Sequence, residues 1–286
     1  MSRSSAIQLA FGGLSPKAVD RHVDRFGSID AAVAAISRGR TRLSPVVCEA
    51  IGTDARTREE ELSSLDARFL RQSDIGFPVR LATYDDAPRW LFVKGTIHNG
   101  PSIGIVGSRA CTSYGLQLAQ EYGAAAAAAG WVVVSGLARG VDAAAHTGAL
   151  SAGGHCTAVL GSGIDVVYPR TNRDLHDRLL KRSGGVMSEF PPGTRPDAWR
   201  FPTRNRVIAG LSDVILVVEA SERGGALITA RIALDYGVPV YAVPGDVDRP
   251  TSAGTNRLIR DGAFPIFGPD DLHTVLSLVS PLIRTT

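Results

Sequence analysis

The turn Gly107-Ser108-Arg109 has the residue types that bind an anion through backbone amides and a guanidinium group. It follows the apolar stretch 102–106 and precedes a sequence typical of a helix. Glycine permits a tight turn, and the first amides of a helix have no partner within it. The stretch is not G-x-G-x-x-G and lacks the Gly-Lys-Ser/Thr of a nucleotide-hydrolysing loop. It predicts a phosphate site of another kind, and the alternative is a plain turn with a solvated arginine.

A second candidate is Arg204-Asn205-Arg206, within "FPTRNRVIAG". Two arginines beside an asparagine, at the expected start of a helix, can reach phosphates and a base edge together. The window 170–206 holds nine basic and four acidic residues, which is typical of a surface that binds a polyanion. The alternative, a solvated charged helix, fits 178–182 better than it fits Arg204 and Arg206.

The third candidate is the pair Gly224 and Gly225, followed by Thr229. Glycines at a helix start after a strand can form a backbone nest for an anion. The alternative is a close-packed turn in which Thr229 caps the helix.

Catalytic residues are less well indicated. Ser135, Asp142 and His146 occur together, but Ser135 is not in a G-x-S-x-G elbow. Asp142 and His146 are four residues apart, a spacing typical of a contact that stabilises a helix. Glu189 has no recognisable partner for acid–base chemistry. We therefore predict no catalytic residues.

Composition narrows the class of protein. The 286 residues carry a net charge of +3 and are 44% hydrophobic, as in globular proteins. All but three of the 31 basic residues are arginines, whose planar groups suit phosphate. Cys48, Cys111 and Cys156 lie far apart, so neither a disulfide framework nor a metal site is expected. With no signal peptide or membrane segment in the pattern, we expect a cytoplasmic protein.

The order of elements predicts an α/β fold. Residues 1–75 read as a small all-helical domain, and 76–100 as a connecting segment. From 101 to 286, apolar runs alternate with helical stretches, which predicts a parallel sheet with ligands at the carboxyl ends of its strands. The expected strands are 102–107, 131–136, 156–161, 185–190, 213–220, 239–245 and 263–267.

Seven linked motifs in 101–268 resemble the DNA-processing protein A family (DprA, also called Smf). They are "GIVGSR", "VVSGLARGVDAAAH", "AVLGSGIDVVYP", "SEFPPG", "FPTRNRVIAGLSDVILVVEA", "GGALITARIALDYG" and "VYAVPG". The resemblance implies an extended Rossmann fold in 101–286 and a SAM-like, helix-hairpin-type domain in 1–75. Many family members add a C-terminal winged helix, which is not expected here because the chain stops too soon.

The resemblance also implies a function. It is that of a non-enzymatic, cytoplasmic homodimer without cofactor or metal. Such a protein binds single-stranded DNA without sequence preference, protects incoming strands and loads the RecA recombinase during natural transformation. Carried over by motif, the DNA-binding residues are Gly107, Ser108, Arg109, Arg170, Arg204, Asn205, Arg206, Gly224 and Gly225.

Two alternatives remain. One is a phosphoribohydrolase-type enzyme, which shares a Gly-Gly turn, although 223–232 lacks the glutamate that its chemistry needs. The other is a carrier of small nucleotides on the same Rossmann-like fold.

Overall fold

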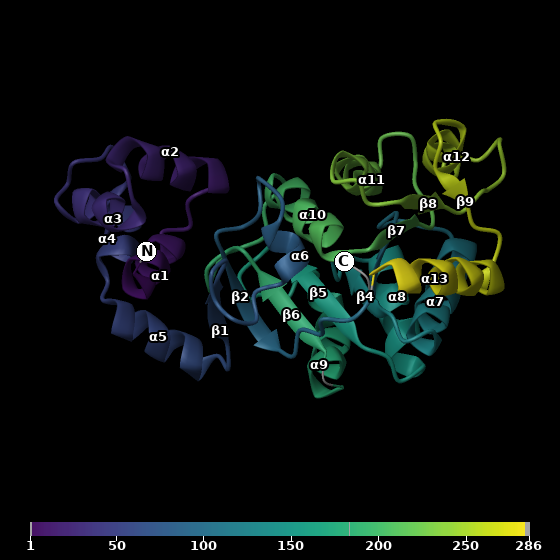
Figure 1. Cartoon of the computed structure of the whole chain (residues 1–286), viewed down its shortest axis with the longest axis horizontal. Helices are drawn as coiled ribbons and strands as arrows, with labels where there is room; N and C mark the ends of the chain where they lie inside the picture. Colours follow the sequence, from purple (N-terminus) through teal and green to yellow (C-terminus); the bar gives the residue numbers. More distant parts are fainter. Residues whose placement is uncertain (1, 183, 284–286) are drawn as a thin grey trace.

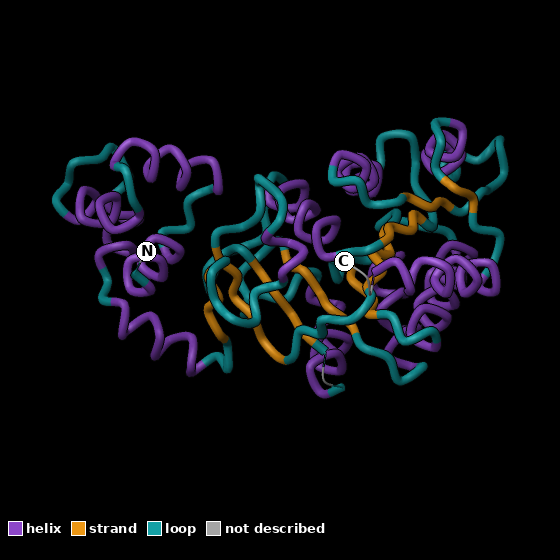
Figure 2. Tube along the Cα trace, viewed as in Figure 1, coloured by secondary structure: helices purple, strands orange, loops and turns teal. Residues whose placement is uncertain are grey.

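The computed structural model describes residues 2–182 and 184–283. Its centre is one nine-stranded sheet with the order β1-β2-β6-β5-β4-β3-β7-β8-β9 (Figures 1 and 2). The strands are β1 (Arg68–Arg71), β2 (Trp90–Gly95), β3 (Ser102–Val106), β4 (Val132–Ser135), β5 (Cys156–Leu160), β6 (Gly185–Ser188), β7 (Val214–Val217), β8 (Val240–Ala242) and β9 (Phe264–Pro265).

In the part of the sheet with the order β6-β5-β4-β3-β7-β8-β9, all neighbouring strands are parallel. This confirms the expected α/β class. The chain runs outward from β3 through β4, β5 and β6, and then returns to place β7 on the other side of β3. The order of the strands therefore reverses between β3 and β7. In open parallel sheets, ligands bind beyond the strand ends at such a switch point.

Helices cover both faces of the sheet. On one face lie α7, α8, α9 and α13, and on the other lie α6, α10 and α11. The helices of this part are α6 (Val79–Ala82), α7 (Ser113–Ala128), α8 (Val141–Ser151), the 3-10 helix η1 (Arg170–Asn172), α9 (Arg173–Lys181), α10 (Arg200–Leu211), α11 (Gly225–Asp235), α12 (Ala253–Arg260) and α13 (Pro269–Ile283).

Close packing of α7 on α8 depends on small residues. A side chain added to Gly123 or Gly148 would meet the backbone of the other helix. The alanine-rich face of α7 lets the two helices approach closely, as their composition suggests.

Five helices precede the sheet and lie at its β1–β2 edge (Figure 1). Phe11 packs edge-on against Phe92 of β2, with ring centroids 5.5 Å apart, so the helices share the hydrophobic core of the sheet. They are α1 (Arg3–Phe11), α2 (Pro16–Phe26), α3 (Ile29–Ser37), α4 (Pro45–Gly52) and α5 (Ala55–Ser64).

The structure differs from the sequence-based expectation at Arg68–Arg71. These residues were expected to be helical, but they form β1, which pairs antiparallel with β2. Strand β2 in turn pairs antiparallel with β6, so the connecting segment extends the large sheet. Alternation is hard to recognise in a strand of four residues, and a partner distant in sequence decides its form.

None of the helices within 2–182 and 184–283 combines the length and the apolar character needed to cross a membrane.

Candidate nucleic-acid interface

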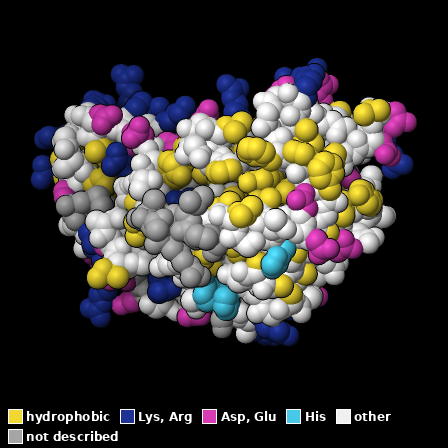
Figure 3. All heavy atoms as spheres, turned by 45° about the vertical axis from the view of Figure 1, so that its right-hand side comes forward, with side chains coloured by type: hydrophobic (Ala, Val, Ile, Leu, Met, Phe, Trp, Pro, Cys, Tyr) yellow, Lys and Arg dark blue, Asp and Glu magenta, His cyan; other side chains and the backbone are white. Residues whose placement is uncertain are grey.

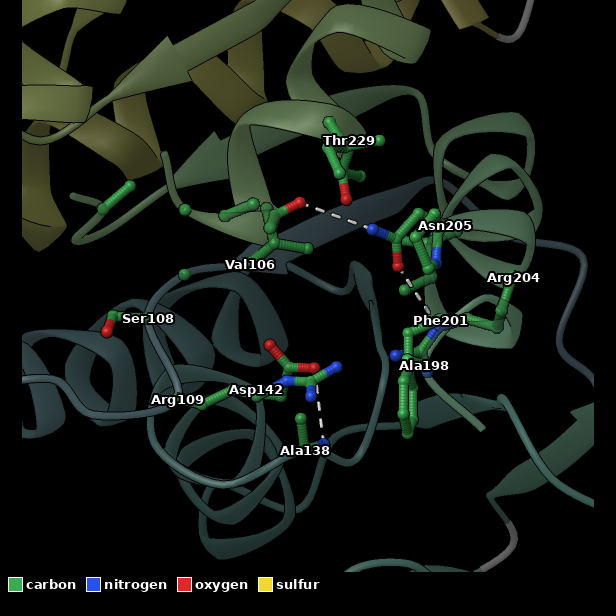
Figure 4. Close-up of a pocket in the computed structure, with 18 of the residues that line it drawn as sticks. Val106, Ser108, Arg109, Ala138, Asp142, Ala198, Phe201, Arg204, Asn205 and Thr229 are labelled. Atoms are coloured by element: carbon green, nitrogen blue, oxygen red, sulfur yellow. Dashed lines mark hydrogen bonds between the residues drawn. The ribbon is translucent and has the colours of Figure 1, made fainter. Parts of the chain in front are cut away.

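A cavity of about 710 Å³ lies at the switch point of the sheet (Figure 4). The loops that follow β3 and β7 form one side, and the starts of α10 and α11 form the other. Of the nine residues carried over by motif, this cavity brings together seven. They are Gly107, Ser108, Arg109, Arg204, Asn205, Gly224 and Gly225.

The Gly-Ser-Arg turn is braced from the neighbouring strand. The Ser108 amide donates to the carbonyl oxygen of Glu219 at 2.7 Å, and the Glu219 carboxylate accepts from the hydroxyl of Thr112 at 2.6 Å. A Cβ at Gly107 would stand 2.5 Å from Val141 Cγ2, so the close approach of this turn to α8 requires glycine. The turn thus has one fixed position beyond β3.

Arg109 extends from this turn with an exposed side chain. Its guanidinium carbon lies 4.3 Å from the ring centroid of Phe201, which belongs to the first turn of α10. Arg109 makes no ion pair with any residue in the described part of the chain. Its charge is therefore available to a ligand, and Phe201 orients it.

Arg204 lines the same cavity but is only 4% exposed. Its Nη1 donates to the carbonyl oxygen of Gly136 at 2.8 Å and also to that of Val159. Burial lowers the pKa of Arg204 to about 10, and the nearby charge of Asp142 opposes this shift. Arg204 stays protonated at neutral pH and holds the loop after β4 against the end of β5 beneath the cavity.

Asp142 and His146 do not form the contact that their spacing suggested. One carboxylate oxygen of Asp142 accepts from the amides of Gly136, at 3.1 Å, and Ala138. Burial raises the pKa of Asp142, and it lowers that of His146 to about 4. Ser135 donates to a backbone carbonyl 2.6 Å away. Ser135 and Asp142 therefore each bind a backbone group of the protein.

Arg206, the second arginine of the Arg-Asn-Arg stretch, points away from the cavity. Its Nη2 contacts both carboxylate oxygens of Glu189, at 2.7 and 2.8 Å. Arg206 is 8% exposed, so this is a buried ion pair. The structure thus gives Glu189 a partner, which sequence reasoning did not provide.

Helix α11 begins at the cavity with no side chain capping it. The positive end of its dipole and its first amides are therefore directed at the cavity. Thr229 is buried in the cavity wall and does not cap the helix. The Asn205 amide joins the starts of α10 and α11, because it accepts from Arg204 Nε and donates to the Gly225 carbonyl. A side chain at Gly225 would meet nothing within 4 Å, so packing within the chain does not require this glycine.

Arg170 is exposed at the start of η1 and does not line the cavity. It follows Tyr168-Pro169, which lines a smaller adjoining hollow of about 260 Å³ together with Arg139. Arg109 and Phe201 line both hollows, so the surface is continuous from one to the other.

Sequence reasoning missed the aromatic residues of this surface. Phe201 and Tyr168 both line the large cavity, with ring centroids 5.7 Å apart. Their neighbours in sequence are basic, as in "YPR" and "WRFPTR", and aromatic residues among basic ones are typical of single-strand binding. That pattern was the available signal.

Cations and carboxylates balance in the cavity wall, where Arg109 and Arg204 stand with Asp142 and Asp197. Asp142 is bound by amides, and Asp197 lies 3.7 Å from Arg200. Within the described ranges, no three histidine, cysteine or acidic side chains are placed to hold a metal ion. Arg109 and the start of α11 are thus the groups that an anion would meet.

Comparison with known proteins places the chain in a family. The model of a family described as "DNA recombination-mediator protein A" matches residues 68–277. The chain is 41% identical over 203 residues to the DNA processing protein DprA of Bacillus subtilis (strain 168), covering 70% of this chain and 68% of the relative. It is also 41% identical over 198 residues to Protein Smf of Escherichia coli (strain K12), of which about half (53%) is covered.

Two solved structures are similar over most of their length. The X-ray structure of DNA processing protein A from Streptococcus pneumoniae has a TM-score of 0.78 at 32% identity and covers 95% of this chain and 98% of that one. A structure of DNA processing protein A from Helicobacter pylori, presented for that protein's single-stranded DNA binding mode, has a TM-score of 0.66 at 27% identity. It covers 77% of this chain and 96% of that one.

Proposed function

This chain belongs to the DNA recombination-mediator protein A family, and from that premise we propose that it binds single-stranded DNA in the cavity at its switch point. The observation that carries the proposal is Arg109, an exposed guanidinium held over Phe201 and without an ion pair in the described part of the chain. The uncapped start of α11 faces it across the cavity. The relative from Helicobacter pylori is described by its single-stranded DNA binding mode.

The chemistry favours a strand over a nucleoside triphosphate. Arg109 and the α11 amides contact phosphate oxygens, and these contacts carry no sequence information. Phe201 and Tyr168 offer rings on which any base can stack. Gly225 leaves room for close approach of the backbone. Binding should therefore be sensitive to salt and tolerant of sequence.

We assign the residues of the motif to two roles. Gly107, Ser108, Arg109, Asn205 and the glycines 224–225 contact the strand, and Arg170 extends the path beyond the smaller hollow. Arg204 and Arg206 act from inside the protein by holding loops and strands in place.

The larger role that we propose is protection of incoming strands in the cytoplasm and loading of the RecA recombinase, without catalysis of a reaction. We also propose that the helices of 1–75 and the unit 101–286 act as two domains, joined by β1 and the segment 76–100, which extend the sheet. Homodimerisation is supported by exposed large hydrophobic residues on α7, β9 and α13. Figure 3 shows hydrophobic side chains gathered on one face of the molecule. The exposed hydrophobic residues of these elements, with the loop before α13, are Tyr114, Phe264, Phe267 and Leu278.

A binding titration tests the proposal. Labelled thymidine oligomers of about 20 nucleotides are titrated with the protein, with duplex DNA and mononucleotides as competitors. We expect the single strand to bind most tightly at each salt concentration. A thermal shift with mononucleotides and none with oligomers would favour a small-nucleotide carrier, and release of a free base from AMP would identify an enzyme.

A second assay tests the loading step. Filament formation by the cognate RecA recombinase is followed on single strands coated with a single-strand binding protein. Addition of this chain should shorten the lag before filaments form. An unchanged lag, with binding of the strand intact, would refute the loading role alone.

A further inference from the structure

A second cavity of about 550 Å³ lies on the other side of α10. Its walls come from the α1–α2 region, the segment between β1 and β2, the end of β6 and the first turns of α10. It therefore lies where the N-terminal helices meet the sheet. Of the nine residues carried over by motif, Arg206 alone lines this second cavity.

The first turns of α10 and the residues just before them separate the two cavities. Ala198, Phe201 and Pro202 face the first cavity, whereas Trp199, Thr203 and Arg206 face the second. A helix with its side chains is about 10–12 Å across. Stacked nucleotides advance by about 3.4 Å each, so roughly three to four nucleotides span this wall.

The exposed ring of Trp199 is the feature of the second cavity that indicates a ligand. It is 41% exposed, whereas Trp90 and Trp131 are 5% and 2% exposed. Its indole stands edge-on to Phe190, with centroids 5.8 Å apart, and the Arg200 guanidinium lies 4.7 Å from its ring centroid. These contacts hold the exposed ring in one orientation, so a planar ligand can stack on it at little cost in entropy.

The charge of the second cavity favours a neutral ligand over a phosphate. Its wall has three basic and four acidic side chains. Arg89 is paired with Asp20 at 2.8 Å, and Arg206 with Glu189 at 2.7 Å. Arg206 Nη1 is buried and has no hydrogen-bond partner in the described part of the chain, so the wall holds a donor without an acceptor. Nucleobases carry such acceptors on their edges and stack on aromatic rings.

We propose that the second cavity binds an unstacked base of the same DNA strand, with Trp199 as its stacking surface. This inference rests on the proposed function of the first cavity. The strand passes over the start of α10, with its phosphates near Arg109 on one side and one base against Trp199 on the other. The N-terminal helices thus contribute to the site by closing the second cavity.

Intrinsic fluorescence tests this assignment directly. Because Trp199 is the most exposed of the three tryptophans, an oligomer of about 12 nucleotides should quench the emission, and one of about two nucleotides should not. Trp199→Ala should bind the longer oligomer about 5- to 150-fold more weakly, the range expected for one stacked base. Trp199→Phe should retain most of the affinity while losing most of the quenching.

The matched control is Val46→Ala, which removes an exposed hydrophobic side chain from α4 and lines neither cavity. It should leave binding and quenching unchanged. Equal affinity of wild type and Trp199→Ala for the longer oligomer, with Arg109→Ala still weakened, would overturn the second subsite and leave the proposed function intact. No binding by the wild type at low salt would overturn the proposed function itself.

Discussion

Arg109→Ala removes the exposed guanidinium that stands at the mouth of the first cavity. The residue makes no ion pair with the described part of the chain, and its ring contact is with the surface of Phe201. Folding should therefore change little, because an exposed cation–π contact contributes only about 0.5–1 kcal/mol. The effect should instead appear in binding and in its dependence on salt.

The magnitude follows from counterion release. One phosphate contact on a single strand contributes about 0.7 to the slope of log K against log salt. If the two proteins bind equally at 1 M salt, the loss of that contact weakens binding about 8-fold at 50 mM and about 3-fold at 200 mM. The gap between variant and wild type should thus close steadily as salt rises.

The assay is fluorescence anisotropy with a labelled thymidine oligomer at about five salt concentrations. Arg56→Ala is the matched control, because it removes an exposed arginine and the same charge from α5. Its salt slope should equal that of the wild type. Arg204→Ala, in contrast, should lower the stability of the fold. It leaves Asp142 buried without its neighbouring cation, which should cost about 3–5 kcal/mol.

The reasoning is refuted if Arg109→Ala and the wild type have the same slope and the same affinity at 50 mM salt. It is also refuted if Arg56→Ala lowers the slope as much as Arg109→Ala does, because the effect would then report net charge alone. A stable Arg204→Ala protein with wild-type Tm would contradict the structural role of Arg204.

Further variants test other parts of the structure. Gly225→Leu fills open space at the start of α11, so Tm should stay constant while the affinity for the strand falls at least about 10-fold. Unchanged affinity would contradict a close approach of the strand to Gly225. Arg206→Ala leaves the Glu189 carboxylate buried alone and should cost about 3–5 kcal/mol in urea unfolding, a loss that Glu189→Gln in the same chain should partly reverse. The pKa of His146 is about 4 in the folded protein and 6.5 in the unfolded chain. The imidazole is therefore neutral in both states well above pH 6.5. As the pH falls from there towards 4, only the unfolded state gains the proton. Stability should therefore drop by up to about 3 kcal/mol over that range, and His146→Gln should flatten the pH profile of Tm. Gly148→Ala should force α8 away from α7 and lower Tm, and a higher Tm would show that the helices have room.

The sequence was sufficient to predict the parallel sheet and the edge at which its candidate ligand site lies. Short apolar runs ending in glycine mark buried parallel strands, and such strands have their carboxyl ends on one side. The turn at Gly107–Arg109 and the glycines 224–225 could therefore be placed together, although more than 110 residues separate them. The family motifs pointed to the same residues.

Tertiary structure alone decided what each arginine of 204–206 does. The sequence suggested a helix start there, but α10 already begins at Arg200, so both arginines lie inside the helix. Residues two apart on a helix point to different sides. Because α10 packs on the sheet in one orientation, Arg204 lies beneath the first cavity and Arg206 contacts Glu189.

Local pattern thus determined the class of fold and the positions of the strand ends, because these depend on residues close together in the chain. Which side chains stay accessible depends on contacts between distant segments. Arg109 meets Phe201, Trp199 meets Phe190, and neither pairing has a signature in spacing. Burial and orientation arise only when the helices pack on the sheet, and they separate the exposed Arg109 from Arg204 and Arg206, which hold the protein together.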